Sequence, residues 1–262
     1  PQTKVFPVTS TRSSILISLI FTMAFFLVPH QGITRVIQAE IEHKDYLPGV
    51  PETFSSGAVL NTDKLEKRVE WFPVPDWMAG TYTKEGDMET FEKDFRSGSE
   101  KRENFWLENR VTLSFGHQRD ALNTIWHAEV LPFRADGTRG RSRDQRYVIG
   151  MSCLKSTPES VVLKFHSVVV ALDDRDRVLG SKQQEEIVSF FPGGGDNFIT
   201  TTSSTKTFSE SGQPLYQLDS HTKRLRTRGF MEEDYLSGID LKRSLNDFLI
   251  GRDMQNRLVR AR

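Results

Sequence analysis

Several short stretches of this sequence carry residue types that catalyse reactions. Ser152 and Lys155 have the Ser-x-x-Lys spacing of a serine nucleophile with a lysine base. That pair works on a helix, where the lysine lies one turn from the serine, together with further conserved motifs. Here it lies in an apolar, strand-like run, and the accompanying motifs are missing. We therefore expect no nucleophilic serine at this position.

The acidic residues and histidines do not have the spacing of a metal site. Asp173, Asp174 and Asp176 lie in a charged turn without the glycine and distal glutamate of a calcium-binding loop. The six histidines are scattered, and Cys153 is the only cysteine, which we expect to be a buried, unreactive thiol. The sequence thus predicts no catalytic residue, no metal and no cofactor.

Composition excludes two broad classes of protein. The chain has 262 residues, with 35 Lys+Arg against 35 Asp+Glu and 37% hydrophobic residues. A nucleic-acid-binding domain would be strongly basic, so we expect no nucleic-acid partner. A disordered chain would have fewer apolar residues, so we expect a packed core.

Two groups of arginines are candidates for binding an anion. Arg224, Arg226 and Arg228 recur at every second residue, which places them on one face of a strand. The stretch 134–146 holds five arginines against two aspartates. One interpretation is a solvated outer face, since long charged side chains usually reach water. The other is a site for a carboxylate-bearing ligand, a lipid head group or an acidic partner.

The pattern of residues predicts a mainly β protein. From about Thr81 to Phe230, six to eight β-rich runs alternate with short polar turns and no helices. Such a series is typical of an antiparallel meander, which tends to close into a barrel because closure removes exposed edges. We expect an irregular lead-in over 40–76, with "TDKLEKRVEW" forming a turn or two of helix, and a β-barrel domain over 77–230.

The two ends of the chain have patterns of their own. We expect residues 231–262 to be a helical tail, because leucines from Leu241 recur at helical spacing, as one helix or as two broken at Gly251. We expect residues 1–39 to be an apolar leader, because an uncharged run at 15–28 follows two basic residues. This pattern predicts an export signal or, if uncut, a membrane anchor over 15–33. We therefore expect an extracytoplasmic location, either the periplasm or the thylakoid lumen.

One short motif resembles a known superfamily. The stretch "PVPDWMAGTYTK" places Trp77 and Gly80 before Tyr82 at the start of the strand-rich region. It resembles the G-x-W signature that begins the first strand of lipocalins, fatty-acid-binding proteins and other calycin barrels. The resemblance implies a barrel closed at one end by this aromatic, with Arg224, Arg226 or Arg228 packing across it. The whole layout is also similar to uncharacterised exported proteins of cyanobacteria and plastids.

Two functions follow from these expectations. The first is a non-catalytic barrel that binds a small apolar or amphiphilic molecule, with Trp77, Gly80, Tyr82 and the three arginines as ligand-binding or barrel-closing candidates. The second is an interaction or assembly subunit of a larger membrane complex, for example a photosynthetic one. That subunit would work through its surface and its C-terminal helix. Bulky inward side chains at Phe165, Phe190 and Trp126 would fill the barrel and favour the second function.

Overall fold

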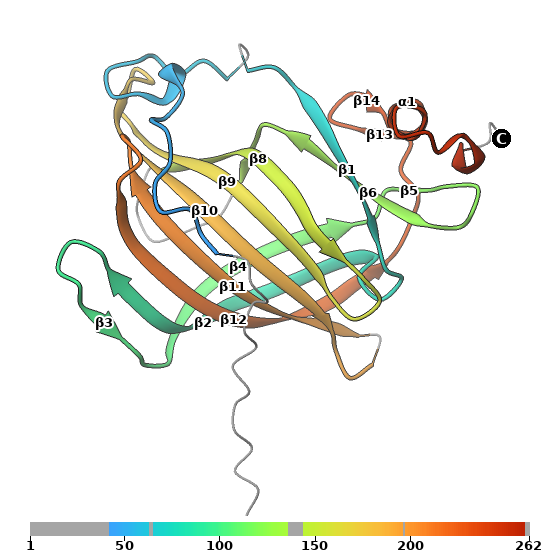
Figure 1. Ribbon diagram of the computed structural model, residues 1–262, viewed down its shortest axis with the longest axis horizontal. Helices are drawn as coiled ribbons and strands as arrows, with labels where there is room; N and C mark the ends of the chain where they lie inside the picture. The colour runs from blue at the N-terminus through green and yellow to red at the C-terminus, as the bar shows by residue number, and fades with distance from the viewer. Residues whose placement is uncertain (1–41, 63–64, 136–143, 196, 260–262) are drawn as a thin grey trace, which may run out of the picture. The chain divides into compact units, whose positions relative to one another are not determined.

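The computed structural model describes residues 42–62, 65–135, 144–195 and 197–259 (Figure 1). This part of the chain is mainly β, as predicted, and every strand pairing in it is antiparallel. The strands are β1 (Arg68–Val74), β2 (Gly80–Asp94), β3 (Glu100–Lys101), β4 (Phe105–Phe115), β5 (Gln118–Arg119), β6 (Ile125–Leu131), β7 (Phe133–Ala135), β8 (Gln145–Ser156), β9 (Val161–Leu172), β10 (Val178–Pro192), β11 (Phe198–Ser209), β12 (Pro214–Gly229), β13 (Tyr235–Leu236) and β14 (Ile239–Asp240), and the helices are η1 (Glu52–Phe54), α1 (Leu241–Ile250) and η3 (Gln255–Arg257).

The long strands form one nine-stranded sheet. Its order is β3-β2-β12-β11-β10-β9-β8-β7, and β4 pairs with β2. Strands β8 to β12 follow one another in sequence, which is the meander expected from short polar turns. The last long strand, β12, returns to pair with the first, β2, through contacts such as Gly229 opposite Gly80.

The paired strands that the structure describes do not form a closed ring. The nine-stranded sheet ends at β4 and β7. The other described strands form a separate three-stranded sheet of order β1-β6-β5 and the β13–β14 hairpin. Two short connections join the two larger sheets. β4 leads through Gly116 into β5, and β6 leads through Pro132 into β7. At this seam the His117 amide donates to the Trp126 carbonyl at 2.7 Å. The closed barrel expected from the sequence is therefore not found.

The nine-stranded sheet has two different faces. One, which we call the core face, carries Leu163, Phe190 and Tyr82, packed in the main apolar cluster with Phe115 and Ile199. Strands β2 and β4 supply the opposite wall of this cluster, behind β10 and β11 in Figure 1. Phe190 is only 2% exposed, so this apolar part of the interior is filled with side chains.

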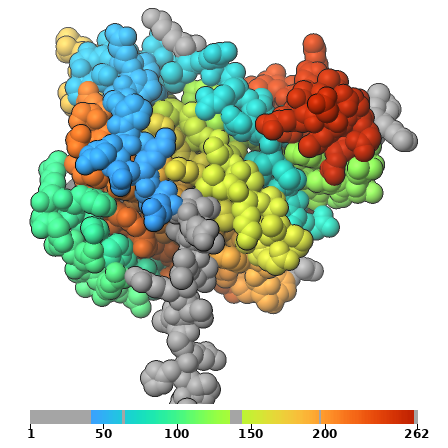
Figure 2. Space-filling view, viewed as in Figure 1, coloured from blue at the N-terminus to red at the C-terminus, as the bar shows by residue number. Residues whose placement is uncertain are grey.

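The other face is covered by the lead-in, and we call residues 42–62 the strap. Phe54 of the strap is fully buried against Val168, Val170 and Tyr147. The Leu47 and Val50 amides donate to backbone oxygens of the β11–β12 turn at 3.0 Å. In the space-filling view the strap (blue) lies directly against the strands beneath it (Figure 2).

Two sequence expectations about flanking segments need correction. Arg68–Val74, expected to be irregular or helical, is strand β1 and pairs along its whole length with β6. Trp126, expected to point into the barrel, instead packs in a cluster with α1.

The C-terminal tail contains an amphipathic helix, as predicted, but the helix is α1 alone, and the β13–β14 hairpin precedes it where helix was also expected. The apolar face of α1 is already occupied. Leu241, Leu245 and Leu249 are fully buried against Trp71 and Trp126 of the β1-β6 sheet. Asp240 caps the helix by accepting from the Arg243 amide, and the helix ends at Gly251, where the break was expected.

The predicted leader, including the apolar run at 15–28, lies outside the described residues. Among the residues that the structure does describe, no helix has the length and apolar character needed to span a membrane.

Two stacked histidines hold the seam between the sheets. Nδ1 of His127 accepts from the Gly116 amide at 3.3 Å, and Nδ1 of His117 accepts from the Ala128 amide at 3.0 Å. The ring centroids are 4.6 Å apart, and both side chains are buried. Burial, with a smaller contribution from His127, lowers the pKa of His117 to about 3. His117 is therefore neutral and accepts the bond from Ala128 through Nδ1. Protonation of Nδ1 would abolish this hydrogen bond.

Acidification should destabilise the fold through His117. The unfolded chain protonates this residue below about pH 6.5, whereas the folded chain does so only near pH 3. The contribution of His117 to the free energy of unfolding is therefore fully present above pH 6.5. Below that pH it falls by about 1.4 kcal/mol per pH unit. Urea unfolding between pH 7 and pH 5 measures this slope. The variant His117→Gln, whose side-chain oxygen can accept the same bond, should show a flatter slope, and the exposed His221→Gln should not. Equal slopes in the wild type and His117→Gln would contradict the assignment.

Candidate functional site

Of the three candidate arginines, Arg226 is the one that contacts the aromatic motif. Its Nε donates to the Tyr82 hydroxyl at 2.9 Å, and its Nη2 donates to the Trp77 carbonyl at 2.8 Å. The Tyr82 hydroxyl donates to the same carbonyl at 2.6 Å. The guanidinium carbon lies 5.3 Å from the Tyr82 ring centroid. The contact thus ties the start of β2 to β12, 144 residues later in the chain.

Gly80 is required where the two strands meet. Its φ is +138°, and a Cβ atom there would lie 2.6 Å from the Arg228 backbone oxygen. A side chain at this position would therefore both strain the backbone and push β12 away from β2.

The side chain of Arg224 lies on the core face of the sheet. It is directly opposite Ile199, a member of the main apolar cluster, and only 7% of its surface is exposed. Its Nε and Nη1 atoms are buried without a hydrogen-bond partner among the residues that the structure describes. An unpaired charged donor in such a place is costly, since it loses water and gains nothing in return.

Four further charged side chains are electrostatically linked to Arg224: Lys84, Asp87 and Glu186 directly, and Arg146 through Glu186. Lys84 forms an ion pair with Asp87, whose carboxylate also accepts from the Asn109 amide at 3.3 Å. Arg146 donates to Glu186 at 2.7 Å. We call Lys84, Asp87, Arg146, Glu186 and Arg224 the interior charge cluster.

The charged groups of this cluster shift one another's pKa. Burial lowers the pKa of Lys84, and the positive charge of Arg224 lowers it further. Burial opposes ionisation of Glu186, but the charges of Arg146, Lys84 and Arg224 outweigh this effect and lower its pKa. Burial also lowers the pKa of Arg224 against the opposing pull of Asp87 and Glu186. The cluster therefore has more positive charge than its surroundings stabilise well.

The core face is less tightly covered beyond Arg224. On β11 and β12 the core-facing Ser203, Thr205, Leu218 and Ser220 are only partly buried. The hydroxyls of Ser203 and Ser220 lie 3.0 Å apart. The interior thus has a filled apolar part and a polar part, which holds hydroxyls and charges and is reached by solvent.

The three arginines predicted on one strand face have different surroundings. Arg228 is exposed and belongs to neither the aromatic contact nor the interior charge cluster. Arg226 is partly buried and Arg224 is buried. The interpretation of these arginines as a solvated outer face is therefore wrong for Arg224. Most of the second basic stretch, 136–143, lies outside the described residues.

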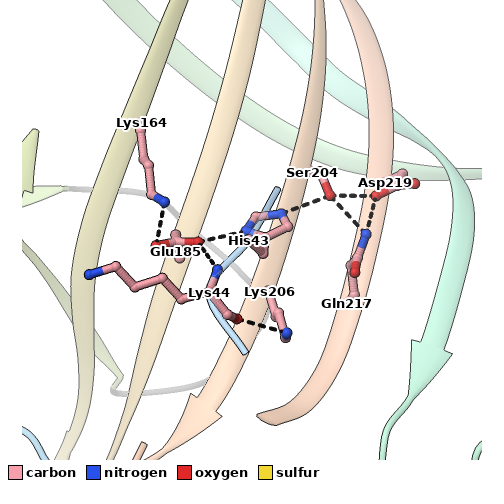
Figure 3. A network of polar contacts seen from close by, with 8 residues as sticks. All are labelled: His43, Lys44, Lys164, Glu185, Ser204, Lys206, Gln217 and Asp219. Atoms are coloured by element: carbon pink, nitrogen blue, oxygen red, sulfur yellow. Dashed lines mark hydrogen bonds and ion pairs between the residues drawn. The ribbon is translucent and has the colours of Figure 1, made fainter. Parts of the chain in front are cut away.

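The strap face carries a second polar network, which has the order of a hydrolytic triad (Figure 3). His43 of the strap lies with Nε2 2.9 Å from the Ser204 hydroxyl and Nδ1 3.1 Å from a Glu185 oxygen. Lys164 pairs with the other Glu185 oxygen at 2.8 Å. Serine, histidine and acid are thus linked by contacts of the correct length.

The surroundings of Ser204 argue against catalysis. Its hydroxyl donates to Asp219 at 2.7 Å and accepts from Gln217 at 3.0 Å. Because Asp219 takes the only serine proton, the Ser204 hydroxyl has no proton to give to Nε2 of His43. The first step of a hydrolytic triad, transfer of the serine proton to the histidine, therefore has no starting geometry here. Ser204 and Glu185 are 5% and 3% exposed, so a substrate has no approach.

We interpret this network as a clamp that fastens the strap. Glu185 also accepts from the Lys44 amide at 2.9 Å, and Lys206 donates to the Lys44 carbonyl at 2.8 Å. Burial raises the pKa of Glu185, but the bonds from His43, Lys164 and the Lys44 amide outweigh it and lower the pKa to about 2.

The remaining candidates from the sequence are the cysteine and a metal site. Burial raises the pKa of the Cys153 thiol to about 11, so the thiolate is scarce at neutral pH. Within the described residues, no group of three or more histidine, cysteine, aspartate or glutamate side chains is placed to bind a metal.

No family model, no curated protein and no solved structure matches this chain. The resemblance to lipocalin-like barrels therefore stays a prediction, carried by the motif at Trp77, Gly80 and Tyr82.

A double-mutant cycle tests the contact between Arg226 and Tyr82. Arg226→Gln and Tyr82→Phe should each lower the free energy of unfolding by about 1–3 kcal/mol, because each leaves a partner unsatisfied. The double variant should lose less than the sum, with a coupling of about 1 kcal/mol. Chemical denaturation of the four proteins measures it. Strictly additive losses would show that the two side chains do not stabilise each other.

Removing His43 should loosen the strap. His43→Ala takes one donor from buried Glu185, so we expect a loss of about 1–3 kcal/mol in unfolding free energy. Amide hydrogen exchange should also rise over 42–50. Lys44→Ala is the matched control, because its side chain is exposed and its backbone bonds to Glu185 and Lys206 remain. Unchanged exchange in His43→Ala would contradict the role of the clamp.

Proposed function

We propose that this protein is a non-catalytic binding protein for a small amphiphilic anion. The observation that carries the proposal is the buried guanidinium of Arg224, whose Nε and Nη1 lack hydrogen-bond partners within the described residues. A protein retains such a group at a cost to stability, and binding an anion would recover that cost. The partly buried hydroxyls beyond Arg224 provide a route for the ligand.

The ligand would lie in the polar part of the interior, with its anionic group on Arg224. The main apolar cluster is already filled by Phe190, Phe115 and their neighbours, so a long apolar chain does not fit there. The apolar portion of the ligand would instead contact partly buried core-face residues such as Leu218 and Phe165.

We further propose that the sheet functions as a lipocalin-like barrel. Its support is the pairing of the first long strand with the last and the contact of Arg226 with Tyr82 across them. The seam between β5 and β6 would complete the wall. Extracytoplasmic location, in a periplasm or a thylakoid lumen, rests on the sequence of the leader alone.

The alternative is a membrane-associated assembly subunit that works through its surface and its C-terminal helix. That function needs a free apolar face, whereas Leu241, Leu245 and Leu249 are buried against the chain's own β1-β6 sheet. The filled apolar part of the interior favours this alternative, whereas the occupied face of α1 and the donors of Arg224 that lack partners within the described residues favour the binding protein.

Calorimetric titration with sodium decanoate tests the proposal. The wild type should bind, and Arg224→Met should bind at least about tenfold more weakly, since a charged hydrogen bond contributes about 1.5–3 kcal/mol. The same variant should unfold at equal or higher urea concentration, because an unpaired buried charge is removed. Arg228→Gln, on the same strand but exposed, should bind as the wild type does. Unchanged binding in Arg224→Met, or a large loss of its stability, would contradict the proposal.

A further inference from the structure

Strand β4 leaves one of its two edges without a partner strand. Within the described residues it pairs with β2 alone, from Phe105 to Phe115. At 11 residues it is about twice as long as a typical strand. It contains no proline and no lysine, the residues that commonly protect a sheet edge from other chains. An edge of this kind is a place where a further strand can add.

The opposite end of the nine-stranded sheet is better protected. The end strand there, β7, is only three residues long and pairs with one part of β8. Beyond β7, the edge of β8 is bound by β1. The Arg68 guanidinium donates to the Ile149 carbonyl at 2.9 Å, and the Ser156 hydroxyl donates to the Pro73 carbonyl at 2.7 Å. Among the described residues, β4 is therefore the long end strand that remains open.

The side chains of β4 alternate regularly between the core face and an outer face. On the core face Leu113 packs against the main apolar cluster, and the Asn109 amide donates to Asp87. On the outer face the hydroxyls of Thr112 and Thr83 lie 2.9 Å apart. The outer row along the open part of the strand is fully exposed and consists of Trp106, Glu108, Arg110 and Thr112. This row thus holds one acid and one base, which flank Asn109.

The sequence of β4 is complementary to itself. A strand pairs with an antiparallel copy of itself about a two-fold axis that passes between one residue and the same residue of the copy. Residues equally far on either side of the axis then face each other. With the axis at Asn109, Glu108 of each chain faces Arg110 of the other. The remaining pairs are Leu107 with Val111, Trp106 with Thr112, and Phe105 with Leu113.

Neighbouring positions of the axis do not give this match. An axis at Glu108 or Arg110 places that charge opposite its own copy, and like charges directly opposite each other destabilise a sheet. An axis at Leu107 or Val111 leaves both charges opposite uncharged residues. Within this range only the axis at Asn109 pairs both charges, so the charges specify one register.

We propose that two copies of this protein form a symmetric dimer through the open edge of β4, about an axis at Asn109. Main-chain hydrogen bonds continue the sheet from one copy into the other, and the two pairs of Glu108 with Arg110 fix the register. Arg110 already donates through Nε and Nη2 to Glu85 of its own chain, at 3.0 and 2.8 Å. Its Nη1, which has no acceptor among the described residues, can donate to Glu108 of the second copy.

Charge reversal tests the dimer. Sedimentation equilibrium of the full chain in mild detergent should show a dimer for the wild type. Arg110→Glu and Glu108→Arg should each raise the dissociation constant at least about tenfold, because each places like charges opposite each other at two symmetric positions. Both residues are exposed, so the variants should fold. Arg175→Glu, the same charge change in the exposed turn between β9 and β10, is the matched control and should dimerise as the wild type does.

Mixing the two reversed variants tests the register. In a dimer of one Arg110→Glu chain with one Glu108→Arg chain, every facing charge pair is again of opposite sign. The mixture should therefore form a heterodimer, which native mass spectrometry distinguishes by mass from either homodimer. A monomeric wild type, an unchanged dissociation constant in Arg110→Glu, or a mixture without heterodimer would each overturn the inference. None of these measurements involves the anion site, so the proposed function is tested separately.

Discussion

The guanidinium of Arg224 is the constraint around which the interior is arranged. Most buried side-chain donors and acceptors in the described residues find partners, but Nε and Nη1 of Arg224 do not. An apolar residue at this position would remove the desolvation cost of the unpaired guanidinium. The chain nevertheless has an arginine there, directly opposite Ile199 of the core. Folding alone does not account for that placement. The anion binding that we propose would account for it, since proteins commonly lose some stability at functional sites.

The division of the interior follows from how the rest of the chain is packed. The strap covers one face of the sheet through Phe54 and the His43 clamp, and α1 covers the β1-β6 sheet through its leucines. Both elements use their apolar surface within the chain. On the core face Tyr82 packs in the apolar cluster and bonds Arg226, whereas core-facing residues beyond Arg224 are only partly buried.

Much of the fold could be predicted from residue periodicity, because strands with one buried face alternate and turns concentrate polar residues. The same reasoning missed β1, a short strand inside a stretch with no clear period. The resemblance to calycin barrels implied that Tyr82 meets an arginine of the last strand, and Arg226 does contact it, but the resemblance could not choose among the three arginines. Lys84 lies two residues after Tyr82, so its inward direction was available from the pattern. The His43–Glu185–Ser204 clamp joins residues 142 and 161 positions apart, which no local pattern reveals.

The most direct measurement of the central claim follows the Nε–H proton of Arg224 by NMR, with Arg224→Met used to assign the signal. In the free protein this proton has no hydrogen-bond acceptor among the residues that the structure describes. The account predicts a downfield shift on titration with decanoate and no shift with decanol, since only the carboxylate accepts the bond. A signal that stays in place while decanoate binds elsewhere would show that Arg224 is not the anion contact.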